Sequence, residues 1–88
     1  MKICPGYVLR QVIDIYVVLG IGSDNYVPNE IMSVNETGAF LWHILEEGAE
    51  KKDLIHRLTV EYGINKDTAA ADVEIFLTQL REKAMIIE

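Results

Sequence analysis

The chain has 88 residues, of which 50% are hydrophobic and 25% are charged, a composition typical of one small globular domain. A domain of this size buries about 60–65% of its unfolded surface, which leaves little room for an enclosed substrate chamber and disfavours most classes of enzyme. Fourteen Asp and Glu residues against eight Lys and Arg residues give a net charge of −6. Because this charge repels phosphate backbones, it argues against a nucleic-acid partner.

Cysteine content and apolar runs indicate the compartment. Cys4 is the only cysteine, which excludes an internal disulfide and a cysteine-based zinc site and favours a reducing environment. The longest apolar run, Ile15–Leu19, is too short to span a bilayer, and no basic segment followed by a long apolar run is present. The sequence therefore predicts a cytoplasmic protein with no membrane contact.

The first part of the chain has the composition of strands. Residues Tyr7–Ile13 and Ile15–Gly20 are rich in β-branched and aromatic side chains, and Asp14 marks the reversal between two antiparallel strands. The cluster of Gly, Ser, Asp, Asn and Pro in Gly20–Pro28 predicts a loop. Ile31–Val34 is long enough for a third strand and too short for a helix.

A helical period begins at Asn35. Asn35 is a good helix N-cap, Glu36 suits the positive end of the helix dipole, and Gly48 is placed as a left-handed terminator. Ser33 with Glu36 forms a rival capping box, so the helix could start two residues earlier. The apolar stripe has three-and-four spacing and consists of Phe40, Leu41, Ile44 and Leu45.

Two further helices follow. The second is predicted from about Lys51 to Tyr62 and ends at Gly63, and the third starts at Asn65. The inward face of the third helix is the clearest amphipathic pattern in the chain: Ala69, Val73, Phe76, Leu77, Leu80 and Ala84. The tail Met85–Ile87 either packs beneath the sheet or adds a final strand. Three strands followed by three helices predict a single α+β domain, residues 1–88, with the helices on one face of a three-stranded antiparallel sheet.

The residue types that carry catalysis or bind metals are scattered. His43 and His56 lie on different predicted helices and have acidic neighbours within helical reach, a pattern typical of surface ion pairs. Cys4 is expected on a flexible terminus without a neighbouring base, so an incidental thiol is favoured over a nucleophile. The fragment Gly20–Gly22 lacks the third glycine of a phosphate-binding loop. The sequence therefore predicts no catalytic residues, no metal site and no cofactor, and hence no enzyme.

Three features are candidates for structural or binding roles. Trp42 borders the stripe of the first helix and is predicted to support the core. Ile75 lies about 200° around the third helix from Val73, so it is predicted to be exposed and could join a partner contact together with Ala71. If the strand within Glu30–Val34 forms a sheet edge beside the third helix, an extended peptide could add to it, although an unused edge is the default alternative.

Several of these segments together resemble the PqqD-like proteins. These are peptide chaperones, or recognition elements, for the precursors of ribosomally synthesised and post-translationally modified peptides. The most specific segment is Asn35–Ala39 followed by Trp42. The other matching segments are Arg10, Ile31–Val34, Leu41, Ile44–Gly48, Asp72-Val73, Phe76-Leu77 and Leu80. Asp14, where many relatives have glycine, and the loop Tyr26–Pro28 depart from the family pattern.

The resemblance implies a winged-helix-like fold and a function. It implies that the leader segment of a precursor peptide binds as an added strand between the third strand and the third helix, and that the domain presents this segment to a modifying enzyme such as a radical-SAM enzyme or a leader peptidase. Arg81 would pair with an acidic residue of the leader. Carried onto this chain, the peptide-binding residues would be Ile31, Met32, Ser33, Val34, Val73, Phe76, Leu77, Leu80 and Arg81.

Two other functions remain open. A winged-helix DNA-binding protein would need a basic recognition helix, whereas residues 65–82 carry two basic and four acidic side chains. A free sheet edge could also pair with a second copy of the chain, which would make the protein a homodimer.

Overall fold

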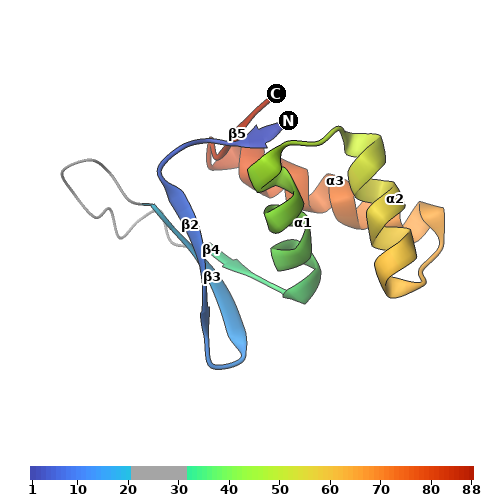
Figure 1. Ribbon diagram of the computed structural model, residues 1–88, viewed down its shortest axis with the longest axis horizontal. Coiled ribbons are helices and arrows are strands. Elements are labelled where there is room, and N and C mark those ends of the chain that lie inside the picture. Colours follow the sequence, from blue (N-terminus) through green and yellow to red (C-terminus); the bar gives the residue numbers. More distant parts are fainter. Residues whose placement is uncertain (21–31) are drawn as a thin grey trace.

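The computed structural model describes residues 1–20 and 32–88. The order of strands and helices confirms the predicted α+β fold, in which a three-stranded antiparallel sheet is followed by three helices (Figure 1). The elements are β1 (Lys2–Ile3), β2 (Tyr7–Val12), β3 (Ile15–Gly20), β4 (Met32–Val34), α1 (Glu36–Glu47), α2 (Lys51–Tyr62), α3 (Lys66–Glu82) and β5 (Ile86–Ile87).

Strands β2 and β3 form the predicted hairpin. Val12 pairs with Ile15, so Ile13 and Asp14 make a two-residue turn and β2 ends one residue earlier than predicted. Ile13 has a φ of +57° and is 86% exposed. Because β-branched residues rarely adopt positive φ, the tip of this hairpin is conformationally strained.

Strand β4 forms one edge of the sheet, whose order is β2-β3-β4. It is antiparallel to β3, with Val34 opposite Tyr16 and Met32 opposite Val18. Met32 is buried whereas Ser33 is exposed, as expected for alternating side chains on a half-covered strand. Of the predicted loop Gly20–Pro28, the structure describes Gly20 alone. The rest of this loop and Ile31 lie outside the described residues.

The helices begin and end largely where their capping residues predict. The Asn35 Oδ1 accepts a 2.8 Å hydrogen bond from the Gly38 N–H, so α1 starts at the predicted cap and the alternative start at Ser33 is not used. Asn65 caps α3 in the same way, and Gly63 ends α2 with a left-handed φ of +64°. Gly48 ends α1, but its φ of +102° and ψ of 138° differ from the left-handed helical conformation predicted for it.

The helices lie together on one side of the three-stranded sheet, with α1 nearest to it (Figure 1). Trp42 has no exposed surface, which confirms its predicted role in the core. The inward face of α3 is also confirmed except for Ala84, which is exposed and has a φ of +55° because α3 ends at Glu82. Met85 is buried instead, and its N–H donates to the Leu80 carbonyl at 2.9 Å.

The two ends of the described chain meet in a second, two-stranded sheet. Ile3 pairs with Ile86, and the Cys4 N–H donates to the Met85 carbonyl at 2.8 Å. The tail therefore forms the predicted final strand, but its partner is β1 rather than the three-stranded sheet (Figure 1). The expectation of a flexible segment around Cys4 was wrong, because backbone hydrogen bonds and the buried Ile3 side chain hold it. No described helix has both the length and the apolar content needed to cross a membrane.

Candidate functional site

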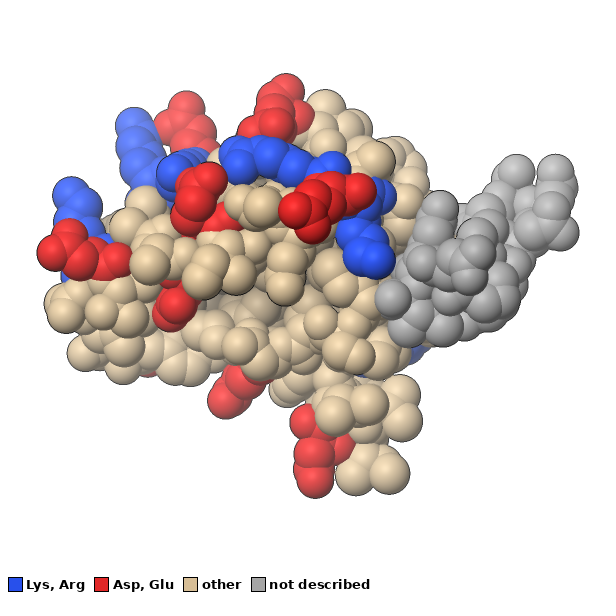
Figure 2. All heavy atoms as spheres, turned by 180° about the vertical axis from the view of Figure 1, so that it is seen from behind, with Lys and Arg blue, Asp and Glu red and all other residues tan. Residues whose placement is uncertain are grey.

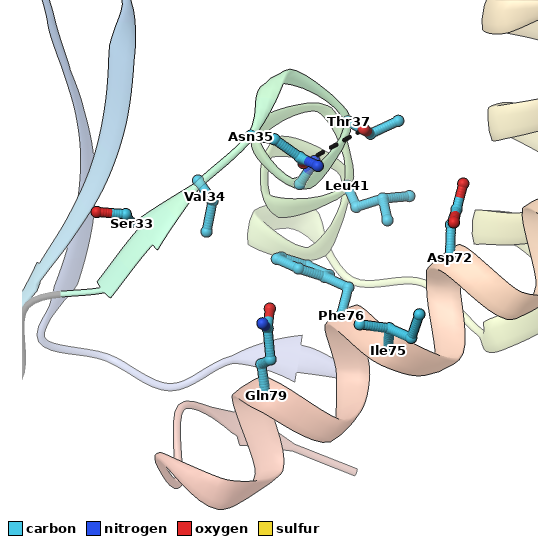
Figure 3. A pocket seen from close by; sticks show the side chains of 10 residues that line it. Ser33, Val34, Asn35, Thr37, Leu41, Asp72, Ile75, Phe76 and Gln79 are labelled. Carbon is cyan, nitrogen blue, oxygen red and sulfur yellow. Dashed lines mark hydrogen bonds between the residues drawn. The ribbon is translucent and has the colours of Figure 1, made fainter.

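A groove of about 370 Å³ lies between the end of β4, the first turns of α1 and one side of α3 (Figure 3). Its walls therefore combine a sheet edge with a helix surface, the arrangement that the resemblance to PqqD-like proteins implied. The residues that line it are Ser33, Val34, Asn35, Thr37, Gly38, Leu41, Asp72, Ile75, Phe76 and Gln79.

The base of the groove is apolar and tightly packed around Gly38. A Cβ atom added to Gly38 would lie 3.1 Å from the Val34 Cβ and 3.3 Å from the Phe76 Cε1. Real Cβ atoms rarely approach neighbours this closely, so the absence of a side chain is what brings β4, α1 and α3 together here. Leu41 and Phe76 are 1% and 5% exposed and form the apolar lining.

The wall on α3 carries exposed side chains. Ile75 is 61% exposed, which confirms the exposure predicted for it. Asp72 and Gln79 lie one turn before and one turn after it, so an apolar side chain is flanked by two polar ones along the groove (Figure 3). This pattern suits a ligand that offers both apolar and polar groups.

The outer edge of β4 faces no other strand of the described chain. Among the described strands, β4 pairs with β3 alone, and the C-terminal tail, which could have covered the edge, pairs with β1. An edge strand presents main-chain N–H and C=O groups to any extended chain that reaches it. The groove therefore has one wall capable of forming a β-ladder and another capable of packing side chains.

The sequence-based site residues divide into three groups. Ser33, Val34 and Phe76 line the groove together. Met32 is buried beneath the sheet edge and Ile31 lies outside the described residues. The third group comprises Val73, Leu77 and Leu80, which have no exposed surface. These three side chains pack in the core and support α3 from beneath, without lining the groove.

Arg81 is also placed away from the groove lining. Its Nε and Nη2 atoms donate to Glu88 Oε1 at 3.1 and 2.9 Å, and its Nη1 lies 3.4 Å from Glu74 Oε1. The bonds from Arg81 lower the pKa of Glu88, and a bond from Lys51 is the main reason that the pKa of Glu74 is lowered. Arg81 is thus engaged by carboxylates of its own chain, which leaves the predicted pairing with an acidic leader residue without support.

Sequence reasoning missed Asp72 and Gln79 as groove residues. The apolar stripe of α3 identified the side that is buried, whereas the groove side is centred about 100° further around the helix. The usable signals were Ile75, a large apolar side chain outside the stripe, and the match of Asp72 to the PqqD-like pattern.

The remaining candidate residues do not form a reactive cluster. His43 Nδ1 lies 3.0 Å from Glu46 Oε1 on the exposed side of α1, a surface contact between the imidazole and an acidic neighbour within helical reach. In residues 1–20 and 32–88, no three His, Cys, Asp or Glu side chains are close enough together to hold a metal ion. Trp42 Nε1 is buried without a hydrogen-bond partner among the same residues.

Charged groups are unevenly distributed over the surface. On the side that Figure 2 shows, Lys and Arg side chains gather along one edge, each close to acidic side chains, while the centre of this face is mostly uncharged. Lys51, Glu74, Arg81 and Glu88 form one network of neighbouring opposite charges. A basic face of the kind that binds phosphate backbones is not visible in this view.

Comparisons with known proteins give concordant results. Residues 16–86 match the family model described as "Coenzyme PQQ synthesis protein D (PqqD)". The structure entitled "TbiB1 in Complex with the TbiA(beta) Leader Peptide" has 26% identity and a TM-score of 0.73 over 97% of this chain and 93% of the other. The structure entitled "Lasso peptide synthetase B1 complexed with the leader peptide" has 25% identity and a TM-score of 0.72 over 99% and 96%. No match was found among curated proteins.

Proposed function

This chain belongs to the PqqD family, and we propose that it binds the leader segment of a ribosomally synthesised precursor peptide and presents that segment to a modifying enzyme. The observation that carries the proposal is the outer edge of β4, which pairs with no strand of residues 1–20 and 32–88 and faces the exposed side chains of α3 across one groove. Recognition of this kind has two components, a main-chain ladder and side-chain packing.

The groove geometry fits an added strand. An extended leader that pairs along Met32–Val34 gains ladder hydrogen bonds, and its alternate side chains point toward Phe76 and Ile75 on the opposite wall. Ordering a flexible peptide costs free energy, so the apolar contacts must supply part of the affinity. The firm packing around Gly38 keeps the groove preformed and reduces that cost.

The solved relatives support the same ligand class. Both structures named above contain a leader peptide, and their folds superpose over nearly the whole of this chain. The leader of this chain's own precursor is therefore the ligand that we propose for the groove.

The proposed role is that of a non-catalytic adaptor. Holding the leader near an enzyme raises the effective concentration of the substrate and requires no acid, base, metal or cofactor on the adaptor itself. A radical-SAM enzyme or a leader peptidase is the proposed partner, and the cytoplasm is the proposed compartment.

DNA binding is less well supported by α3. This helix carries Lys66 and Arg81 against four acidic residues, and Arg81 is already paired with Glu74 and Glu88. Few phosphate contacts are available, and such contacts supply most of the affinity of DNA-binding proteins. Self-pairing through β4 is the second alternative, and it is an outcome of the test below.

The proposal is tested by titrating isotope-labelled protein with the leader of a precursor peptide encoded beside its gene. Backbone amide signals of Ser33, Val34, Ile75 and Gln79 should shift, whereas those of α2 should not. Shifts confined to residues away from the groove, or none at millimolar peptide, would contradict it. Sedimentation of the free protein as a dimer, with loss of the dimer in Ser33→Pro, would favour self-pairing instead.

A further inference from the structure

Asp72 has a distinct position among the groove residues. Of the ten described residues that line the groove, it is the only acidic or basic one. Its carboxylate has no hydrogen-bond or ion-pair partner in the described part of the chain, whereas Glu74, two residues later on α3, is bridged by both Lys51 and Arg81. The groove therefore presents an unneutralised negative charge to whatever enters it.

The charges around the groove reinforce this asymmetry. Arg81, the basic residue of the last turn of α3, is held by Glu88 and Glu74, and no Lys or Arg is among the described lining residues. The protein as a whole carries a net charge of −6. Both the local and the long-range field consequently favour a cationic ligand group over an anionic one.

We propose, on the basis of the function proposed above, that Asp72 selects leader peptides that carry a Lys or Arg at one fixed position. This preference for a basic leader residue is the opposite of the preference implied for Arg81, which would select an acidic leader residue. The basic side chain extends over the first turn of α1 and forms an ion pair with Asp72, while the neighbouring apolar residue of the leader packs on Ile75 and Phe76.

The distance along the leader between the basic residue and the residue that faces Gln79 follows from α3. Figure 3 shows Gln79 at the end of the groove nearer to β4 and Asp72 at the far end, beyond Leu41. Two turns of helix separate them, which is about 10 Å along the axis. An extended chain advances about 3.3 Å per residue, so the basic residue lies about three residues from the leader residue that faces Gln79.

The test uses a display library of random short peptides, selected on the wild-type protein and on Asp72→Lys. Peptides enriched on the wild type should carry Lys or Arg one or two residues from an apolar residue, because Asp72 and Ile75 lie about 4.5 Å apart along the axis of α3. On Asp72→Lys the same position should change to Asp or Glu. The matched control is Asp67→Lys, because Asp67 is an acidic residue of α3 that does not line the groove; this variant should enrich the same basic peptides as the wild type.

Affinity measurements with one selected peptide test the ion pair to Asp72 quantitatively. Replacing its basic residue by norleucine should weaken binding to the wild type about twofold to fivefold at low salt, as for an exposed ion pair, and should leave binding to Asp72→Asn unchanged. The difference should shrink at high salt. An equal loss on both proteins, or a basic preference that persists on Asp72→Lys, would overturn the assignment.

Failure of this inference is distinguishable from failure of the proposed function. Peptides that bind the wild type, lose binding to Ile75→Glu and show no charge preference would leave the groove as the leader site and eliminate the role of Asp72. No enrichment on the wild type, or peptides that bind Ile75→Glu equally well, would remove the groove itself as a peptide site.

Discussion

Two sides of α3 can be compared residue by residue. Val73 and Leu77 on one side have no exposed surface and belong to the core, whereas Ile75 on the other side is 61% exposed and lines the groove beside β4. Both sides are apolar at these positions, so hydrophobicity alone does not distinguish them. The comparison indicates that one side of the helix determines stability and the other determines binding, and variants on the two sides should separate these properties.

The largest effect is expected on the buried side. Leu77→Ala removes a fully buried side chain and should lower the free energy of unfolding by about 2–5 kcal/mol, a large part of the stability of a small domain. Chemical denaturation of the variant measures this directly. A loss below about 1 kcal/mol would mean that α3 is not packed through this side.

The next effect is expected on the groove side. Ile75→Ala should change the free energy of unfolding by less than about 0.5 kcal/mol because the side chain is exposed. It should weaken leader binding about fivefold to twentyfold, since apolar area is buried only in the complex. Val60→Ala, which truncates a 71% exposed side chain on α2, is the control and should retain full affinity when both are measured by calorimetry.

Two helix caps provide a matched pair. Asn35 and Asn65 each accept a 2.8 Å hydrogen bond from the N–H three residues later, but only Asn35 lines the groove. Either substitution by Ala should cost about 1 kcal/mol of stability. Only Asn35→Ala should also alter leader affinity in fluorescence titrations, and a comparable change in Asn65→Ala would show that the effect is transmitted through stability alone.

The smallest effect is expected on the free energy of unfolding at acidic pH. The pKa values of Glu74 and Glu88 are lowered from 4.5 by Lys51 and Arg81. Their ion pairs therefore contribute stability above pH 4.5 that is lost as the pH falls through the lowered values. Arg81→Gln should flatten the decline in unfolding free energy between about pH 5 and pH 3, and the change should be slight because both carboxylates are exposed. A steeper decline in the variant would contradict the assignment of these pairs.

Much of the fold was predictable because it depends on local signals. Asn35, Gly63 and Asn65 determine helix ends through bonds or backbone angles within one turn, and the three helices lie where these residues place them. The pairing of β1 with β5 was not predictable, because it joins two-residue strands from opposite ends of the chain. Segments this short carry no periodicity that would reveal a partner.

The site was predicted only in part, for a geometric reason. The resemblance to PqqD-like proteins implied β4 and α3 as the two walls, and Ser33, Val34 and Phe76 do lie together. The apolar stripe of α3 shows which side is buried, but the side that faces β4 depends on how α1 spaces the two elements. That spacing is a tertiary property, so Asp72 and Gln79 became recognisable only in the structure.

The close approach at Gly38 also has a consequence for the size of the ligand. A Cβ atom added to Gly38 would lie 3.1 Å from the Val34 Cβ and 3.3 Å from the Phe76 Cε1, so the floor of the groove has no free space for a methyl group. A methyl group there would push the two walls apart or raise the floor, and so change the largest anchor side chain that can be seated. The residue at this one position therefore limits the bulk of the leader side chain that the groove can hold.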